Sequence, residues 1–439
     1  MTKIDLVYIN AGGGHRAAAL GLDEVIRRQR RPWEIRLVNL FEVLDPRNVF
    51  YRATGMKPEH YYNARLARGW TLGFAQELRI LQGLIRLSHR SLVAQIAAHW
   101  RSTRPDMVVS LVPNFNRAMY TALAQVRAEA PYATILTDFA DFPPHFWIEP
   151  GQAQHLICGT PRAVEQARAA GYDHAHIHAT SGMIIRPDFY STAPFDRWAG
   201  MRRLGLDPGR QTGVVMFGGQ GSRAMLQIAK RLTEMQLILI CGHNTALADR
   251  LRALPLAAPR VVVGFTPRIR DYLRLGDYFI GKPGPGSISE AVQLGLPVIV
   301  VRNAWTMPQE RYNADWICEN GAGLVLDSFK AIRGAVAALN ARLGEFRARI
   351  AKISNRAVFE IPDVLDRILG ARAAQNFGEF GYFRALARKP LLPLAVVPPV
   401  GTRMKSPLYF PVREGRGEIA EVGARADSRT ALDVKINFD

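Results

Sequence analysis

The chain has 439 residues, of which 48% are hydrophobic and 22% charged, and it carries a formal net charge of +19. This composition excludes a disordered protein, and the length is sufficient for two or three domains. The positive charge favours contact with polyanions such as nucleic acid, anionic lipid or phosphorylated substrates. No segment resembles a motif that reads DNA or RNA, so we expect no nucleic-acid partner.

Cysteine usage and hydropathy set expectations about the compartment. The three cysteines lie far apart at positions 158, 241 and 318, without the spacing of a zinc site, which favours core thiols in a reducing compartment. The first residues enter a strand pattern without a signal-peptide core, and no run of about 18 apolar residues occurs. We therefore expect a cytoplasmic protein that meets a membrane, if at all, from its inner face as a peripheral protein.

Short apolar runs alternate with helical patterns along most of the chain. The predicted strands are Ile4–Asn10, Ile35–Leu40, Met107–Val112, Ala133–Thr137, His155–Cys158, Gly213–Phe217, Leu237–Cys241, Val261–Phe265, Tyr278–Gly281 and Pro297–Val301. Apolar runs of this length separated by helices indicate parallel sheets that are covered on both faces. The fold class is therefore α/β, of the doubly wound kind.

The pattern of strand, glycine turn and helix begins twice, at Ile4 and again at Gly213. Two Rossmann-like domains in tandem fit this repetition better than one large sheet. We place them at residues 1–190 and 205–350, because turn-forming residues cluster near Pro187–Arg210. Residues 371–439 change in character, and we expect a partly disordered C-terminal extension there.

The first glycine turn, with Gly13 and Gly14, leads directly into a helix that carries His15. Glycine permits positive φ and close approach of a ligand. The turn lacks the GxGxxG fingerprint, and no acidic residue occupies the ribose position, so a dehydrogenase is a poor fit. The helix dipole keeps His15 neutral and able to accept a proton. The alternative is a histidine that only orders the turn.

Residues 70–101 combine helical apolar spacing with arginines, as at Leu81, Ile85, Arg79 and Arg86. One interpretation is an amphipathic element that docks on anionic lipid. The other is an ordinary helix that covers the first sheet. Periodicity does not separate the two.

Asp138 follows a predicted strand directly. Ligands of open α/β sheets gather outside the carboxyl ends of strands, so Asp138 should face the same cleft as His15. It could orient His15 or act as the base itself, but it could also cap the next turn. No Asp-x-Asp motif occurs in the chain, so we expect diphosphate charge to be met by N–H groups and cations, with no metal and no other cofactor.

The second half of the chain contains the residues expected to bind a donor. Glycine turns precede helices at Gly218 and Gly219 and again before the helix that starts near Ser287, and such helix starts bind phosphate. Glu290, one turn into that helix, can accept hydrogen bonds from a ribose diol. Beyond the next strand, Gln309 and Glu310 can hold sugar hydroxyls. Gly286, Ser287 and Ser289 complete the expected diphosphate site.

The string KPGPGS…EA…GLPVI…PQE, which begins at Lys282, resembles the donor-binding half of family-28 glycosyltransferases. It is most similar to monogalactosyldiacylglycerol synthases and processive diacylglycerol glucosyltransferases, within a group that also includes the MurG-type peptidoglycan enzyme. The resemblance implies the GT-B fold, with an acceptor domain and a UDP-sugar domain that face each other across a cleft. It also implies a helix that crosses back, expected at residues 351–370.

The resemblance also implies residue roles. His15 would be the general base, helped by Asp138, in a GGGH-type loop where Gly13 and Gly14 face the acceptor. His145 and Trp147 would lie near the acceptor as well. On the donor side, a stretch that includes Phe265 and Thr266 would read uracil, and Asn244 or His243 would line the nucleotide pocket.

The predicted function is therefore metal-independent, inverting transfer of a hexose from UDP-galactose or UDP-glucose to diacylglycerol or another lipid acceptor at an anionic membrane surface. Three alternatives stay open. One is MurG-like transfer of GlcNAc to a polyprenyl-linked acceptor. Another is a UDP-sugar 2-epimerase, which shares the fold but needs no acceptor. The third is a membrane- or nucleic-acid-binding protein that has lost catalysis.

Overall fold

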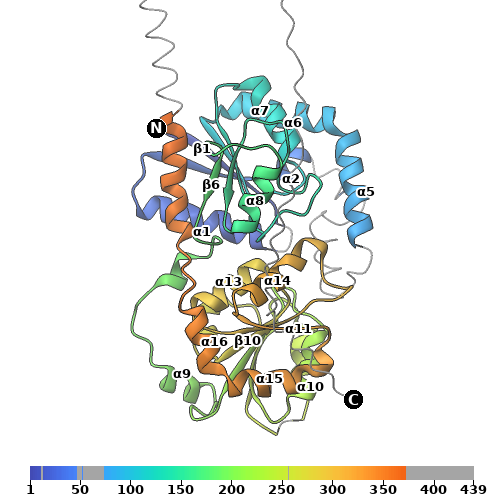
Figure 1. The fold of residues 1–439 in the computed structure, drawn as a ribbon, viewed down its shortest axis with the longest axis vertical. Helices are drawn as coiled ribbons and strands as arrows, with labels where there is room; N and C mark the ends of the chain where they lie inside the picture. The colour runs from blue at the N-terminus through green and yellow to red at the C-terminus, as the bar shows by residue number, and fades with distance from the viewer. Residues whose placement is uncertain (11–12, 47–51, 53–73, 256, 372–439) are drawn as a thin grey trace, which may run out of the picture. The chain divides into compact units, whose positions relative to one another are not determined.

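The computed structural model describes residues 1–10, 13–46, 52, 74–255 and 257–371. This part of the chain forms two six-stranded sheets, each with helices packed around it (Figure 1). The α/β prediction is confirmed. The extension expected at 371–439 lies outside the described residues, apart from Ala371.

The first sheet is entirely parallel and has the order β2-β1-β3-β4-β5-β6. Its strands are β1 (Thr2–Tyr8), β2 (Trp33–Asn39), β3 (Met107–Ser110), β4 (Tyr132–Ile135), β5 (His155–Cys158) and β6 (Ile177–Ala179). β3 and β4 are buried along their whole length, as expected for strands covered on both faces.

Helices cover both faces of this sheet. α1 (Gly14–Arg28) packs in one hydrophobic cluster together with a helix over residues 357–371, which reaches the first sheet from the far end of the described chain. The opposite cluster contains residues of α2 (Leu40–Leu44), α6 (His89–Thr103) and α7 (Asn116–Val126). α8 (Pro161–Ala169) packs beside β5 in a smaller cluster.

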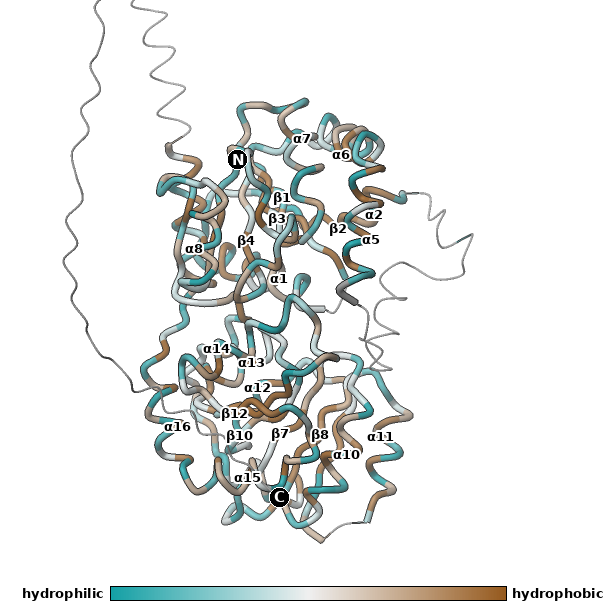
Figure 2. Tube along the Cα trace, turned by 45° about the vertical axis from the view of Figure 1, so that its right-hand side comes forward, coloured by the Kyte–Doolittle hydropathy of each residue, from teal (hydrophilic) through white to brown (hydrophobic). Residues whose placement is uncertain are grey.

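The second sheet is also parallel, with the order β12-β11-β10-β7-β8-β9. Its strands are β7 (Thr212–Met216), β8 (Gln236–Ile240), β9 (Arg260–Val263), β10 (Tyr278–Gly281), β11 (Val298–Val301) and β12 (Gly323–Leu326). Hydrophobic residues concentrate along these strands (Figure 2), since both faces are covered.

One face of the second sheet packs against α13 (Pro285–Gln293) and α14 (Arg311–Glu319). The other face packs against α10 (Ala224–Arg231), α11 (Thr245–Arg252) and α15 (Ile332–Ala341). The remaining elements are η1 (Pro187–Tyr190), α9 (Arg197–Arg203), α12 (Ile269–Leu273), η2 (Pro308–Glu310), η3 (Phe329–Ala331) and α16 (Leu343–Ile350).

The ten predicted strands are present, but the sequence interpretation missed two edge strands, β6 and β12. β6 is only three residues long and contains His178, while β12 begins with Gly323. Edge position alone does not explain the omission, since β2 and β9 are edge strands as well and were predicted; β6 and β12 have only short apolar runs.

Residues 74–103 form two helices with different surroundings, so each of the two earlier interpretations fits one helix. α6 buries Val93, Ile96 and Trp100 and is a covering helix of the first sheet. α5 (Phe74–Leu87) instead leaves an apolar row exposed. Its exposed members are Ile80, Leu81, Leu84 and Leu87.

Candidate active site

His15 lies in the first turn of α1, where the preceding Gly13 adopts φ +82°, a conformation that favours glycine. The imidazole Nδ1 is 2.9 Å from the hydroxyl of Thr137, which follows β4. Its ring also packs at 5.9 Å from the ring of Trp147. Burial lowers the pKa of His15 to about 4, and the nearby charge of Lys282 acts in the same direction. His15 is therefore neutral near pH 7.

Asp138 is buried beside this histidine and accepts a 3.0 Å hydrogen bond from the indole N–H of Trp147. Burial raises its pKa to about 7; the Trp147 bond opposes the shift and the charge of Glu310 adds to it. The hydrogen bond at Nδ1 of His15 is made by Thr137 and not by Asp138, so the role of Asp138 stays a prediction. A threonine one position before the expected aspartate was not singled out in the sequence.

His145 and Trp147 differ from their expected position at the acceptor. Trp147 is fully buried, and its backbone N–H donates to the carboxylate of Asp141 at 2.7 Å. His145 adopts φ +59° and pairs with Glu149 at 2.6 Å. Neither side chain lines the cavities described below. Trp147 instead contacts both His15 and Asp138, so it positions the site from behind.

The helix expected near Ser287 begins slightly earlier, with Gly284 as N-cap and Pro285 in the first turn. Ile288 N–H bonds to the carbonyl of Gly284, so the N–H groups of Gly286 and Ser287 precede the first helical hydrogen bond. Both residues line the cavity that contains His15. Ser289 is buried and does not line it, so the structure places Ser289 outside the expected diphosphate site.

Glu290 lines the same cavity from the next turn of α13. Burial raises its pKa to about 7, and the guanidinium of Arg186 opposes that shift. Arg186 also donates to the carbonyl of Pro267 at 2.8 Å, which ties the segment after β6 to the second half of the chain. Sequence reasoning gave Arg186 no role.

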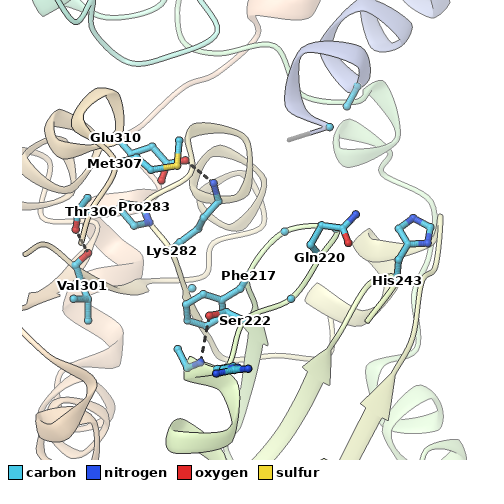
Figure 3. A pocket seen from close by; sticks show the side chains of 18 of the residues that line it. Phe217, Gln220, Ser222, His243, Lys282, Pro283, Val301, Thr306, Met307 and Glu310 are labelled. Carbon is cyan, nitrogen blue, oxygen red and sulfur yellow. Dashed lines mark hydrogen bonds and ion pairs between the residues drawn. The ribbon is translucent and has the colours of Figure 1, made fainter. Parts of the chain in front are cut away.

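Lys282, directly after β10, forms a 2.5 Å ion pair with Glu310 of η2, as Figure 3 shows. Glu310 is buried and the lysine is one-third exposed, so the lysine keeps one side open to a ligand. The sequence interpretation used Lys282 only as part of a motif. The sequence did contain a signal for this role, because Lys282 is a cation that directly follows a predicted strand and precedes a glycine turn.

Two cavities meet at this ion pair. The smaller, of about 600 Å³, contains His15, Asp138, Gln309 and the start of α13. The larger, of about 960 Å³, contains the Gly218–Gly219 turn and Phe265. Lys282 and Glu310 line both cavities, as do Arg186 and Gly218. Their volumes fall in the range of small-molecule sites.

The larger cavity has aromatic and glycine walls. The rings of His243 and Phe265 stack at 4.1 Å with an interplanar angle of 17°, and Phe265 is 64% exposed. Asn244 does not line it; its side chain caps α11 by accepting from Leu247 N–H. Thr266 also lies outside the lining, where its hydroxyl accepts from Arg268 N–H. His243, the alternative to Asn244, is the lining residue.

Two glycine turns of the second half, at Gly219 and at Gly242, hold each other in place. A Cβ at Gly242 would lie 2.1 Å from the carbonyl oxygen of Gly219, and Gly242 has φ +59°. His243 N–H donates to that carbonyl at 2.8 Å. Only glycine at position 242 lets the Gly219 turn approach the stacked His243 ring.

Two searches of the described residues gave no result. Within those ranges no group of three or more His, Cys, Asp and Glu side chains is arranged to hold a metal ion. In the same part of the chain, no helix has the length and hydropathy to cross a membrane.

Two parallel six-stranded sheets of Rossmann-like topology, with ligand-sized cavities at their strand ends, are features of the GT-B fold, and solved structures support this fold. The MurG structure from Acinetobacter baumannii matches with a TM-score of 0.54 at 11% identity, covering 84% of this chain and 100% of that chain. A UDP complex of S. aureus MnaA matches with a TM-score of 0.54 at 14% identity, covering 84% and 96%. The predicted GT-B fold is confirmed.

Sequence comparison finds relatives among glycosyltransferases. Residues 214–367 match the glycosyltransferase family 28 C-terminal domain. A probable monogalactosyldiacylglycerol synthase 2 of Oryza sativa subsp. japonica is 26% identical over 344 residues, which are 73% of this chain and 69% of that protein. Monogalactosyldiacylglycerol synthase 2 of Arabidopsis thaliana is 25% identical over 75% of this chain and 72% of its own length. The chain is thus a glycosyltransferase related to monogalactosyldiacylglycerol synthases, and the predicted resemblance is confirmed.

Proposed function

We propose that this glycosyltransferase moves a hexose from UDP-galactose or UDP-glucose to the free hydroxyl of diacylglycerol, with inversion and without a metal. One observation carries the proposal: a neutral, partly buried histidine shares a cavity with the helix start of Gly286 and Ser287 and with Gln309 and Glu310. A base, an anion site and sugar-binding side chains thus surround one space.

His15 is the proposed base. We infer that Nε2 meets the acceptor hydroxyl, because Nδ1 is engaged by Thr137; the ring also has a hydrogen bond with the Leu111 backbone. That hydroxyl gives its proton to Nε2 while its oxygen attacks the anomeric carbon, and the bond from that carbon to the UDP oxygen breaks on the opposite face. UDP leaves with the electron pair. The Asp138 carboxylate stabilises the imidazolium through the local field, since it lies in the same cavity lining.

The leaving diphosphate is met by backbone N–H groups and one cation. Gly286 and Ser287 offer their N–H groups at the positive end of α13, and the Gly218–Gly219 turn approaches from the other cavity. Lys282 lies where the two cavities meet. We infer that the diphosphate draws Lys282 partly away from Glu310, which frees Glu310 to accept hydrogen bonds from the sugar.

The remaining donor contacts follow from position. Gln309 joins Glu310 at the hexose, and Glu290 accepts from the ribose diol, which its raised pKa allows in either protonation state. The uracil ring of UDP stacks on the exposed face of Phe265, whose other face packs against His243. Gly13 and Gly14 line the side of the cleft from which the acceptor enters.

A lipid acceptor is supported by apolar surface as well as by the names of the relatives. The His15 cavity has an apolar wall that includes Ile9, Phe41, Leu78 and Leu81. Leu78 and Leu81 belong to α5, whose other leucines and Ile80 are exposed. We infer that α5 rests on an anionic membrane from the cytoplasmic side, so that diacylglycerol can pass from the bilayer to His15.

The test is a product assay with purified protein, vesicles of anionic lipid with diacylglycerol, and radiolabelled UDP-galactose, UDP-glucose and UDP-GlcNAc in chelator. Label in the lipid phase from UDP-galactose or UDP-glucose, lost in His15→Ala, is the expected result. Transfer from UDP-GlcNAc to a polyprenyl-linked acceptor would indicate the MurG-like alternative. Interconversion of free UDP-sugars without an acceptor would indicate an epimerase. Either outcome replaces the proposal.

A further inference from the structure

A third cavity, of about 560 Å³, lies at the amino ends of the strands of the second sheet, whereas the donor site lies at their carboxyl ends. Asp277, in its lining, directly precedes β10, whereas Lys282 directly follows that strand. A four-residue strand separates the two positions by roughly 15 Å. This cavity therefore cannot share a ligand with the donor site. It is lined by Phe195, Arg197, Arg274, Gly276, Asp277, Leu294, Gly295, Leu296 and Arg347.

Positive charge dominates this cavity. Three of its lining residues are arginines and one is an aspartate. Both oxygens of Asp277 are occupied: Oδ2 accepts from Arg197 at 2.8 Å and from Thr212 N–H at 2.9 Å, and Oδ1 accepts from Arg347 at 2.9 Å. One carboxylate thus neutralises one of two arginines, and Arg274 adds a further charge.

Arg274 has donors to spare. Its guanidinium lies 4.1 Å from the ring centre of Phe195, which fixes the plane of the fork. Among the described residues, its guanidinium donates one hydrogen bond, to the Ala193 carbonyl at a long 3.4 Å. Burial lowers the pKa of Arg274, the nearby charge of Arg270 acts in the same direction, and the charge of Asp271 opposes it. Fixed guanidinium forks with free N–H groups match the oxygens of a phosphate.

We propose that this cavity binds a phosphate-type dianion, either inorganic phosphate or the terminal group of a phosphomonoester. The site joins three segments: Arg197 comes from α9, Arg274 from the end of α12, and Arg347 from α16. α9 follows the first sheet in the chain, and α16 precedes the helix over 357–371 that returns to it. A bound dianion therefore fixes both connections between the sheets at their base. This inference does not depend on the proposed transferase reaction.

The test is a calorimetric titration of the full-length protein with inorganic phosphate at low ionic strength. Arg274→Gln and Arg347→Gln should each weaken binding at least tenfold, and Arg274→Lys should retain part of it. Arg250→Gln is the matched control, because it removes the same charge from an exposed position on α11. Saturating UDP is present throughout, so that the donor cavity is occupied and the titration reports this site alone. Melting curves verify that each variant is folded.

Binding experiments with two kinds of lipid vesicle identify the source of the phosphate. Phosphatidylcholine vesicles with phosphatidic acid present a monoester, and vesicles with phosphatidylglycerol present only a diester. If the protein binds vesicles with phosphatidic acid and Arg274→Gln reduces this binding, the ligand is a lipid headgroup. If the protein responds to free phosphate alone, the ligand is soluble. Both results support the site. No phosphate binding by the wild type, or equal losses in Arg274→Gln and Arg250→Gln, would overturn the proposal.

Discussion

The two edges of the cleft are built in different ways. On the first sheet, the reactive groups are side chains held by other side chains: Thr137 holds His15, and Trp147 holds Asp138. On the second sheet, the ligand-facing groups are mainly backbone N–H groups at glycine turns, with the Lys282–Glu310 pair as the charged element. The first edge is desolvated enough to shift the pKa values of both His15 and Asp138.

This difference in construction suits the first edge to the proposed proton transfer and the second edge to the binding of the donor. A proton-transfer site needs burial, because burial tunes protonation. A diphosphate site needs N–H groups that remain accessible at a helix start. Substitutions on the first edge should therefore act on turnover and its pH dependence, while those on the second edge should also act on donor affinity.

His15→Ala should give the largest effect and tests the first edge most directly. Loss of a general base lowers kcat by about 10²–10⁴-fold. The dissociation constant of UDP, measured by calorimetry, should stay within about twofold because His15 does not line the larger cavity. A parallel loss of UDP binding would show that the two edges are not separable.

Lys282→Met should lower kcat/KM by about 10²–10³-fold, because it removes a charge from the leaving diphosphate. UDP affinity should fall as well, which distinguishes this variant from His15→Ala. Lys282→Arg keeps the charge and is the matched control. Full activity in Lys282→Met would contradict the proposed movement of Lys282 from Glu310 to phosphate.

Asp138→Asn should change the pH profile. His15, with a pKa of about 4, is already neutral above pH 5, so the acid limb near pH 7 should report Asp138 or Glu290. Activity rises with pH as these carboxyls ionise. In Asp138→Asn we expect a tenfold or greater loss of kcat. If Asp138 sets the acid limb of the pH profile, that limb should also move to lower pH in this variant. Glu290→Gln is the comparison, since only the variant that moves the limb identifies the group.

Phe265→Ala should weaken UDP binding by about 3–10-fold, the value of one aromatic contact. Phe265→Tyr preserves the stacking surface over His243 and should bind nearly as the wild type does. Calorimetry with UDP and with inorganic pyrophosphate separates the two contributions. An equal loss for both ligands would mean that Phe265 does not contact the base.

The last prediction concerns stability, and the sign of this change is opposite to that of the change in activity. The folded protein keeps a proton on Asp138 up to about pH 7, while an unfolded aspartate releases it near pH 4. Stability therefore falls as pH rises through this interval. Asp138→Asn should be more stable than the wild type at pH 8, by at most about 4 kcal/mol, and equal to it at pH 4. Thermal melts at both pH values measure this.

The sequence predicted what depends on local patterns. Apolar runs gave ten strands and the α/β class, and a glycine-proline turn gave the anion-binding start of α13. The missing parts depend on contacts between distant segments. Thr137 and His15 are 122 residues apart, and Lys282 and Glu310 are 28 apart, so no spacing connects them. Likewise, the break at Ser88 between α5 and α6 has no proline or glycine to mark it. The positions of the domain boundaries remain predictions.

The helix over residues 357–371 has a consequence for how the protein is made. Val358, Ile361 and Leu365 complete the core against which α1 packs, and Arg31 near the end of α1 pairs with Asp363 and Asp366. During synthesis, the half that leaves the ribosome first thus waits for residues that leave more than 150 positions after its last strand. Until then α1 packs on the first sheet, but the apolar side chains that Val358, Ile361 and Leu365 cover stay exposed, so the first half is the one that would engage a chaperone.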